Sequence, residues 1–207
     1  MFHINEFENN NLLLKVDSPY SLNYLVFVQN VFLNKRDGSN HFPSIDSSKW
    51  SLLQQDEFQV KFKSIWDEVI RKNIQSPHYD YNGVLESDAP LYRQLFEGNE
   101  NGEYGFSESI KLFQSWWGNI FFGKGAMEIV YEAEGSRIYD ELVIAIKSKN
   151  LILPNNQLTI MLLYDKQTIV DKNVMPYHYV LPIEELFVNK SNIVANILKD
   201  LNVKGHC

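Results

Sequence analysis

The feature that most constrains the fold is a long helical periodicity between about residues 48 and 74. Large apolar residues recur there at spacings of three and four, namely Phe58, Phe62, Ile65, Trp66, Val69 and Ile70. Charged residues fill many of the positions between them. Because residues three and four apart share one helix face, this stretch predicts an amphipathic helix whose apolar face must be covered by other elements.

Further helices are predicted on both sides of this stretch. Ser18 and Pro19 predict a helix start, with Ser18 as the N-cap and Pro19 in the first turn. Later helices are expected within residues 89–96, 107–117 and 126–149, the last with an interruption at Gly135. These patterns together predict a helical body over residues 17–149.

The periodicity changes after residue 154. Residues 158–164 are rich in β-forming side chains and predict a buried strand, and residues 174–181 predict a second strand. Residues 165–167 predict a hairpin connection between the two strands. A closing helix is expected over residues 191–201.

These elements predict a mainly helical α+β fold. We expect a single domain over residues 1–207, with a helical body and a small antiparallel β element near the C-terminal end. The β element and the closing helix occupy residues 157–202. An additional short strand is expected at residues 11–16.

The chain is acidic. Its 207 residues include 26 Asp and Glu against 19 Lys and Arg, which gives a formal net charge of −7 at pH 7. Most of the excess lies between Asp80 and Asp140. Such a surface repels phosphate backbones and attracts cations or basic partners, so we expect a basic protein partner and no direct nucleic-acid binding. The alternative is a solvated acidic face that only keeps the protein soluble.

Cysteine usage and apolar runs bear on the compartment. The chain has a single cysteine, Cys207, and therefore forms no intramolecular disulfide. Residues 1–11 lack the basic start and apolar run of a signal peptide, and no apolar run is long enough to cross a bilayer. We expect a cytoplasmic, bacterial protein with no membrane segment.

Several catalytic motifs are absent from the sequence. It contains no GxxxxGKS or GxxxxGKT phosphate loop, no HExxH metal motif, no CxxC pair and no GxSxG nucleophile turn. No strand–GxGxxG–helix unit appears either, because Gly118, Gly123 and Gly125 have the wrong spacing and order for it. Whether the protein is an enzyme stays open at this point.

One segment resembles the calcium-binding loop of an EF-hand over residues 97–108. The alternating ligand positions of such a loop fall on Glu97, Asn99, Asn101, Glu103 through its carbonyl, and Glu108. Gly102 occupies the position of the sharp turn. The segment departs from the pattern at Glu97, where Asp is usual, and at Tyr104, and no second loop exists. The alternative is an acidic surface loop that binds no metal.

A second candidate site consists of His78, Asp80 and Glu86, with Asp88 close by in sequence. A His-x-Asp pair places an imidazole and a carboxylate on one extended face, which suits a divalent metal or general acid–base catalysis. The alternative is that these residues belong to a loop that follows a helix end.

The aromatic residues allow a third interpretation. Trp116 and Trp117 are adjacent, and neighbouring residues on a helix point about 100° apart, so both cannot lie in one narrow apolar stripe. One of them is therefore a candidate for a pocket edge or a partner surface. Together with Trp50, Trp66, Phe121 and Phe122, they either line an apolar ligand pocket between helices or form the core.

The leading hypothesis is a non-enzymatic, acidic interaction or regulatory module that binds a protein partner, with no cofactor assigned. Two alternatives stay open. One is a protein that binds calcium or another divalent metal through residues 97–108. The other is an enzyme of unrecognised type that uses the His78, Asp80 and Glu86 group. A homo-oligomer is compatible with each of the three.

Overall fold

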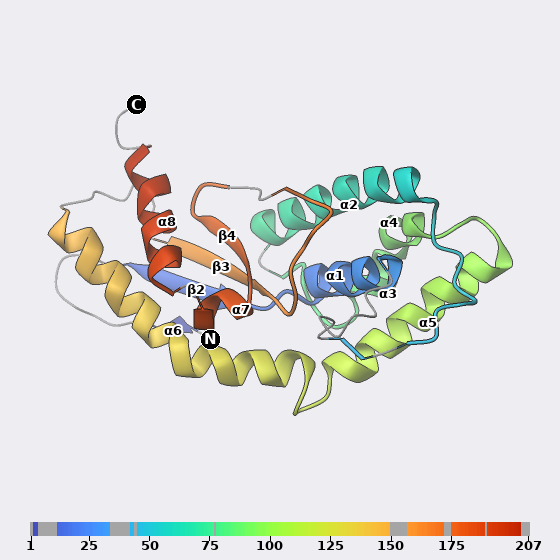
Figure 1. Cartoon of the computed structure of the whole chain (residues 1–207), viewed down its shortest axis with the longest axis horizontal. Helices are drawn as coiled ribbons and strands as arrows, with labels where there is room; N and C mark the ends of the chain where they lie inside the picture. Colours follow the sequence, from blue (N-terminus) through green and yellow to red (C-terminus); the bar gives the residue numbers. More distant parts are fainter. Residues whose placement is uncertain are drawn as a thin grey trace.

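The computed structural model of the chain has helices at one end and a small sheet at the other (Figure 1). It describes residues 2–3, 12–33, 42–43, 45–76, 78–149, 157–171, 175–188 and 190–203. Among these residues, no helix has the length and apolar character needed to cross a bilayer.

The helical end is built around one buried helix. Its elements are α1 (Tyr20–Phe32), α2 (Gln55–Gln75), α3 (Val84–Ser87), α4 (Ala89–Tyr92), a 3-10 turn (Arg93–Leu95) and α5 (Glu100–Trp117). In α1 every residue from Tyr20 to Asn30 is buried. The predicted amphipathic helix corresponds to α2, whose six periodic apolar residues are all buried.

The sheet has three parallel strands, β2 (Leu13–Asp17), β3 (Gln157–Leu163) and β4 (His178–Pro182), in the order β2-β3-β4. The two-residue strand β1 (Phe2–His3) pairs with β2 in the antiparallel direction at the edge. The predicted antiparallel hairpin is therefore wrong, because β4 runs parallel to β3.

The arrangement of β3 explains this correction. Parallel strands cannot be joined by a tight turn, and residues 164–177 provide the longer crossover that they require. Six of the seven residues of β3 are buried, so both of its faces are covered. A continuous apolar run of this kind is typical of a central strand in a parallel sheet.

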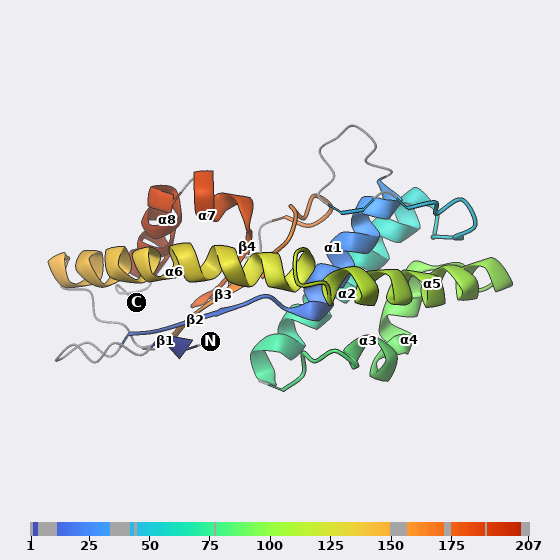
Figure 2. The ribbon, with the colours of Figure 1, turned by 90° about the horizontal axis from the view of Figure 1, so that it is seen from below.

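Three helices complete the sheet end: α6 (Gly123–Ser148), α7 (Glu184–Val188) and α8 (Lys190–Val203). The long α6 runs along the sheet end, where it packs against β2 and α8, and α5 continues along the helical end (Figure 2). It continues through Gly135, where an interruption was predicted. The ring of Tyr131 lies 2.3 Å from the place where a Cβ at Gly135 would be, so this glycine permits close packing within a continuous helix.

Candidate functional site

Asp80, predicted as an acid–base residue, caps a helix. Its carboxylate accepts hydrogen bonds from the backbone N–H of Tyr20 at 2.6 Å and of Ser21 at 2.9 Å, and from the Ser21 hydroxyl. These groups lie at the start of α1, which has Pro19 as its N-cap and no cap from Ser18. The expected cap therefore comes from a residue distant in sequence, because Asp80 reaches the unpaired N–H groups of the first turn.

Burial dominates the electrostatics of this capping site. The pKa of Asp80 is raised above its ordinary value, mainly because burial disfavours the charged carboxylate, although its hydrogen bonds oppose the shift. Burial likewise raises the pKa of the neighbouring Tyr20 to about 12. The Asp80 side chain therefore serves as the cap of α1.

The other members of the predicted His, Asp and Glu group do not converge on Asp80. His78 is exposed, and Glu86 accepts a hydrogen bond from Gln114 of α5. Asp88 accepts hydrogen bonds from the Lys72 ammonium at 2.6 Å and from a tyrosine hydroxyl at 2.9 Å. Each of the three carboxylates serves a separate contact between helices.

The segment over residues 97–108 is largely helical. α5 begins at Glu100, seven positions before the predicted start at residue 107, and Asn99 is its N-cap through a 2.8 Å bond from the Gly102 N–H. Asn99 thus marks the start of α5, because its short polar side chain satisfies the otherwise unpaired N–H of Gly102.

The proposed calcium ligands lie at separate places on this segment. Glu97 accepts a 2.7 Å bond from the amide of Asn99, and Glu103 pairs with Arg93 at 2.8 Å. Glu108 lies 3.9 Å from Lys111. In the part of the chain that the structure describes, no group of three His, Cys, Asp or Glu side chains is arranged to hold a metal ion. Calcium binding stays a prediction from the sequence.

The tryptophan pair points into two neighbouring parts of the aromatic core. Trp117 is buried, and its ring stacks on Phe113 at 5.5 Å between centroids. Trp116 is partly buried, with its ring 4.7 Å from that of Phe42 and 4.6 Å from that of Tyr164. The two rings lie 5.8 Å apart and both contact Phe113, so they belong to one aromatic cluster. A role of either tryptophan at a pocket edge or partner surface stays a prediction.

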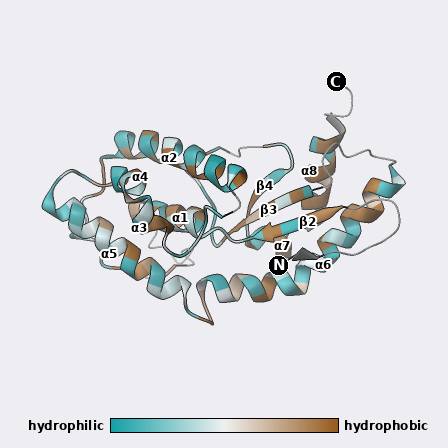
Figure 3. Ribbon diagram, turned by 180° about the vertical axis from the view of Figure 1, so that it is seen from behind, coloured by the Kyte–Doolittle hydropathy of each residue, from teal (hydrophilic) through white to brown (hydrophobic). Residues whose placement is uncertain are grey.

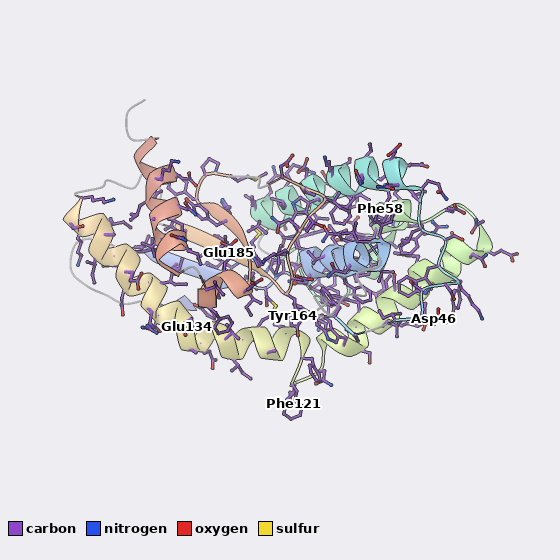
Figure 4. The ribbon with its side chains drawn as sticks, viewed as in Figure 1. Asp46, Phe58, Phe121, Glu134, Tyr164 and Glu185 are labelled. Carbon is purple, nitrogen blue, oxygen red and sulfur yellow. The ribbon has the colours of Figure 1, made fainter. Side chains whose placement is uncertain are left out.

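The turn between α5 and α6 is the feature that the sequence did not predict. Its side chains Ile120, Phe121 and Phe122 are 74%, 78% and 54% exposed. Figure 4 shows Phe121 pointing away from the body of the protein, and the turn carries the brown of hydrophobic residues in Figure 3. We refer to residues 119–123 as the apolar turn. Large apolar side chains are normally buried, so three consecutive exposed ones form an unusual apolar group at the surface.

Backbone and side-chain contacts hold the apolar turn in one conformation. The side chain of Asn119 accepts a 2.9 Å bond from the Phe121 N–H, and its carbonyl oxygen accepts one at 3.3 Å from the Phe122 N–H. Gly123 has a φ of +52°, and a Cβ there would lie 2.6 Å from the Cα of Trp117. Only glycine accommodates both constraints easily. Gly123 therefore helps to set the path of the chain between α5 and α6.

Glycine placement was the available signal for this turn. Gly118 ends α5, and Gly123 and Gly125 start α6. A Cβ at Gly125 would lie 2.3 Å from the carbonyl oxygen of Ile120. Glycines on both sides of three apolar residues indicate a tight turn, and a tight turn cannot bury its central side chains unless another element covers it.

Two cavities in the described part of the chain lie away from the His78, Asp80 and Glu86 group and from residues 97–108. One, of about 260 Å³, lies beside α6 at the ends of β2 and β3, and its lining includes Asp17, Glu128 and Glu132. Another of about 260 Å³ lies between α2, β4 and α8, with Trp66 and Tyr179 in its lining. Neither brings together a set of catalytic groups that matches the predicted chemistry.

Comparisons with known proteins were made at the level of families, sequences and folds. The chain matches no protein-family model, no curated protein and no solved structure. The geometry of the chain itself is therefore the basis for the function proposed below.

Proposed function

We propose that this protein is an interaction module that binds a protein partner through the apolar turn. The observation that carries the proposal is the exposure of three consecutive large side chains, Ile120, Phe121 and Phe122, on a turn of fixed conformation. Single exposed apolar residues are normal on protein surfaces, whereas a contiguous group of them is typical of a binding site.

The energetics favour a direct role in binding. Removing one large apolar side chain from water contributes roughly 2 kcal/mol, so three of them supply enough free energy to anchor an interface. Aromatic side chains in the centre of an interface dominate its binding energy. The two hydrogen bonds to Asn119 within the turn reduce the backbone entropy that binding would cost.

The charges near the turn favour a protein over a membrane. Lys124 in the first turn of α6 pairs with Glu128 at 3.8 Å, and the exposed Glu132 one turn further on leaves a net negative charge. Carboxylates near a bilayer are repelled by the negative surface potential of anionic lipids. A protein partner can instead place basic side chains opposite them.

The experiment compares three forms of the protein as bait in a native lysate. Wild type, an Ile120→Ser/Phe121→Ser double variant and a Val60→Ser control are each immobilised at equal density. Val60 is 68% exposed on α2, so the control removes an exposed apolar group elsewhere. We expect wild type and the control to retain the same stoichiometric partner and the double variant to lose it.

Two results would contradict the proposal. The first is retention of the same partner by the double variant at the wild-type level. The second is binding of wild type to phosphatidylcholine vesicles that the double variant lacks, because this result would make the apolar turn a membrane anchor.

A further inference from the structure

Helix α6 presents apolar side chains on two opposite faces. One face is buried against the rest of the protein and includes Met127, Tyr131, Ile138, Leu142 and Ile146. On the other face Ile129 and Ile144 are 66% and 67% exposed. A surface helix normally has polar residues on its outer side, so these two isoleucines need an explanation.

The exposed isoleucines belong to a continuous stripe. Ile129, Ala133, Ser136, Asp140 and Ile144 are spaced by four, three, four and four residues, and all of them are exposed. This spacing places them on one face of the helix over about 22 Å, at a rise of 1.5 Å per residue. The small residues in the middle leave room for the backbone of a second helix to approach. We call these five residues the outer stripe.

The outer stripe continues the apolar turn. Phe122 is the extended N-cap of α6, so the apolar turn leads directly into the helix that carries the stripe. One partner element can therefore contact the turn and the stripe together.

Acidic side chains lie within the outer stripe, at Asp140, and on both sides of it. Residues 128–141 contain five carboxylates and a single base, Arg137, whose guanidinium lies 3.7 Å from Glu134. Glu132 lies beside the stripe on one side and Glu141 on the other, and both are exposed. A partner that covers the stripe must face this negative charge.

We infer that the outer stripe and the apolar turn together bind an amphipathic helix with an apolar stripe and basic flanks. The inference rests on the proposed function and specifies the chemistry of its partner. Apolar contacts along the stripe supply affinity, and lysine or arginine flanks pair with Glu132 and Glu141. A second copy of the chain fits less well, because the carboxylates of its own α6 would face the same carboxylates on the first copy.

The experiment uses two synthetic helical peptides of about 18 residues, a length that matches the stripe. Both carry the same leucine stripe, one with lysine flanks and the other with glutamate flanks. Fluorescence anisotropy measures their binding to the full-length wild type, to Ile129→Ser/Ile144→Ser, to Glu132→Gln/Glu141→Gln and to Val60→Ser.

We expect the lysine peptide to bind wild type and the Val60→Ser control equally, and the glutamate peptide to bind neither. The isoleucine variant should weaken binding of the lysine peptide by about tenfold, which corresponds to about 1.4 kcal/mol. The glutamine variant should weaken it at low salt and make the remaining affinity less dependent on salt.

Equal binding of the lysine peptide to wild type and to the isoleucine variant would overturn the inference, as would equal binding of the two peptides to wild type. A wild-type dimer in sedimentation that Ile144→Ser dissociates would also overturn it, because a second copy would then occupy the stripe. If the α6 variants keep the partner captured from lysate and only the Ile120→Ser/Phe121→Ser variant loses it, the proposed function stands without this inference. Capture by that turn variant at the wild-type level would contradict the proposed function itself.

Discussion

Helix α1 buries polar side chains, whereas the apolar turn exposes apolar ones. In α1 the polar residues Asn23 and Gln29 are completely buried. In the apolar turn Ile120 and Phe121 are the most exposed large apolar side chains of the described residues. Both arrangements run against the usual preference of these residue types, so each requires compensation.

In α1, hydrogen bonds to other parts of the chain compensate for the burial of these polar side chains. The amide of Asn23 donates to the Pro19 and Leu162 carbonyl oxygens at 2.8 and 3.0 Å, and its oxygen accepts from the Tyr164 N–H at 2.7 Å. Gln29 likewise bonds to the backbone of Lys166, Thr168 and Ile169. These side chains attach the crossover after β3 to α1, and they are structural.

The apolar turn has no such compensation among the described residues. Its backbone is fixed by hydrogen bonds, but its large side chains extend into solvent. A buried polar group with all its partners supports the fold, whereas the exposed apolar group of the turn is the surface that the proposed partner would cover.

The largest effect is expected at Asn23. Asn23→Ala leaves the Leu162 carbonyl and the Tyr164 N–H without their partner in a buried site, and we expect a loss of about 3 kcal/mol in the free energy of unfolding. Urea denaturation measures it. The control Asn101→Ala removes an exposed asparagine and should change the value by less than about 0.5 kcal/mol. A loss at Asn23 no larger than in the control would show that its hydrogen bonds do not support the fold.

A smaller loss is expected at Gly123. Gly123→Ala places a Cβ at positive φ and close to the backbone of Trp117, which should cost about 2 kcal/mol in the free energy of unfolding. Gly98→Ala is the matched control, because no atom lies within 4 Å of its added Cβ. Equal thermal stability of the two variants would argue against a fixed conformation of the apolar turn.

The pH dependence of stability tests the Asp80 cap. The pKa of Asp80 is raised in the folded state by burial, so the folded protein binds this proton more tightly than the unfolded chain. The stability that protonation contributes is present at low pH and declines as the pH rises from the ordinary value of 3.8 through the raised folded pKa.

The measurement is the free energy of unfolding of wild type and Asp80→Asn across this pH range. Wild type should lose stability relative to the variant as the pH rises, because only wild type acquires a buried charge. A difference between the two proteins that is constant with pH would contradict the raised pKa.

The sequence was sufficient where a local pattern decided the structure. The spacing of Phe58, Phe62 and Val69 predicted α2, and the run around Ile160 predicted β3. Strand direction could not be predicted in this way, because the pairing of β3 with β4 depends on the path of a crossover that has no local pattern.

The positions of the predicted site residues could not be derived from the sequence for a similar reason. In the sequence, Asp80 is simply a carboxylate in a loop. Its role as a cap follows only from the fold, because the N–H groups that it caps belong to α1, about 60 positions away. Phe121 and Phe122 were predicted to line a pocket or the core on the basis of residue type alone. Their exposure follows from Gly118 and Gly123, whose turn leaves them outside the helix packing.

The most direct test of the central claim is site-specific photo-crosslinking from position 121. A photoreactive phenylalanine replaces Phe121 in one protein and Val60 in another, and both are irradiated in native lysate and analysed by mass spectrometry. The account predicts a discrete adduct with one partner from position 121 and none from position 60. No adduct at position 121, or the same adducts from both positions, would contradict the claim that the apolar turn is the binding element.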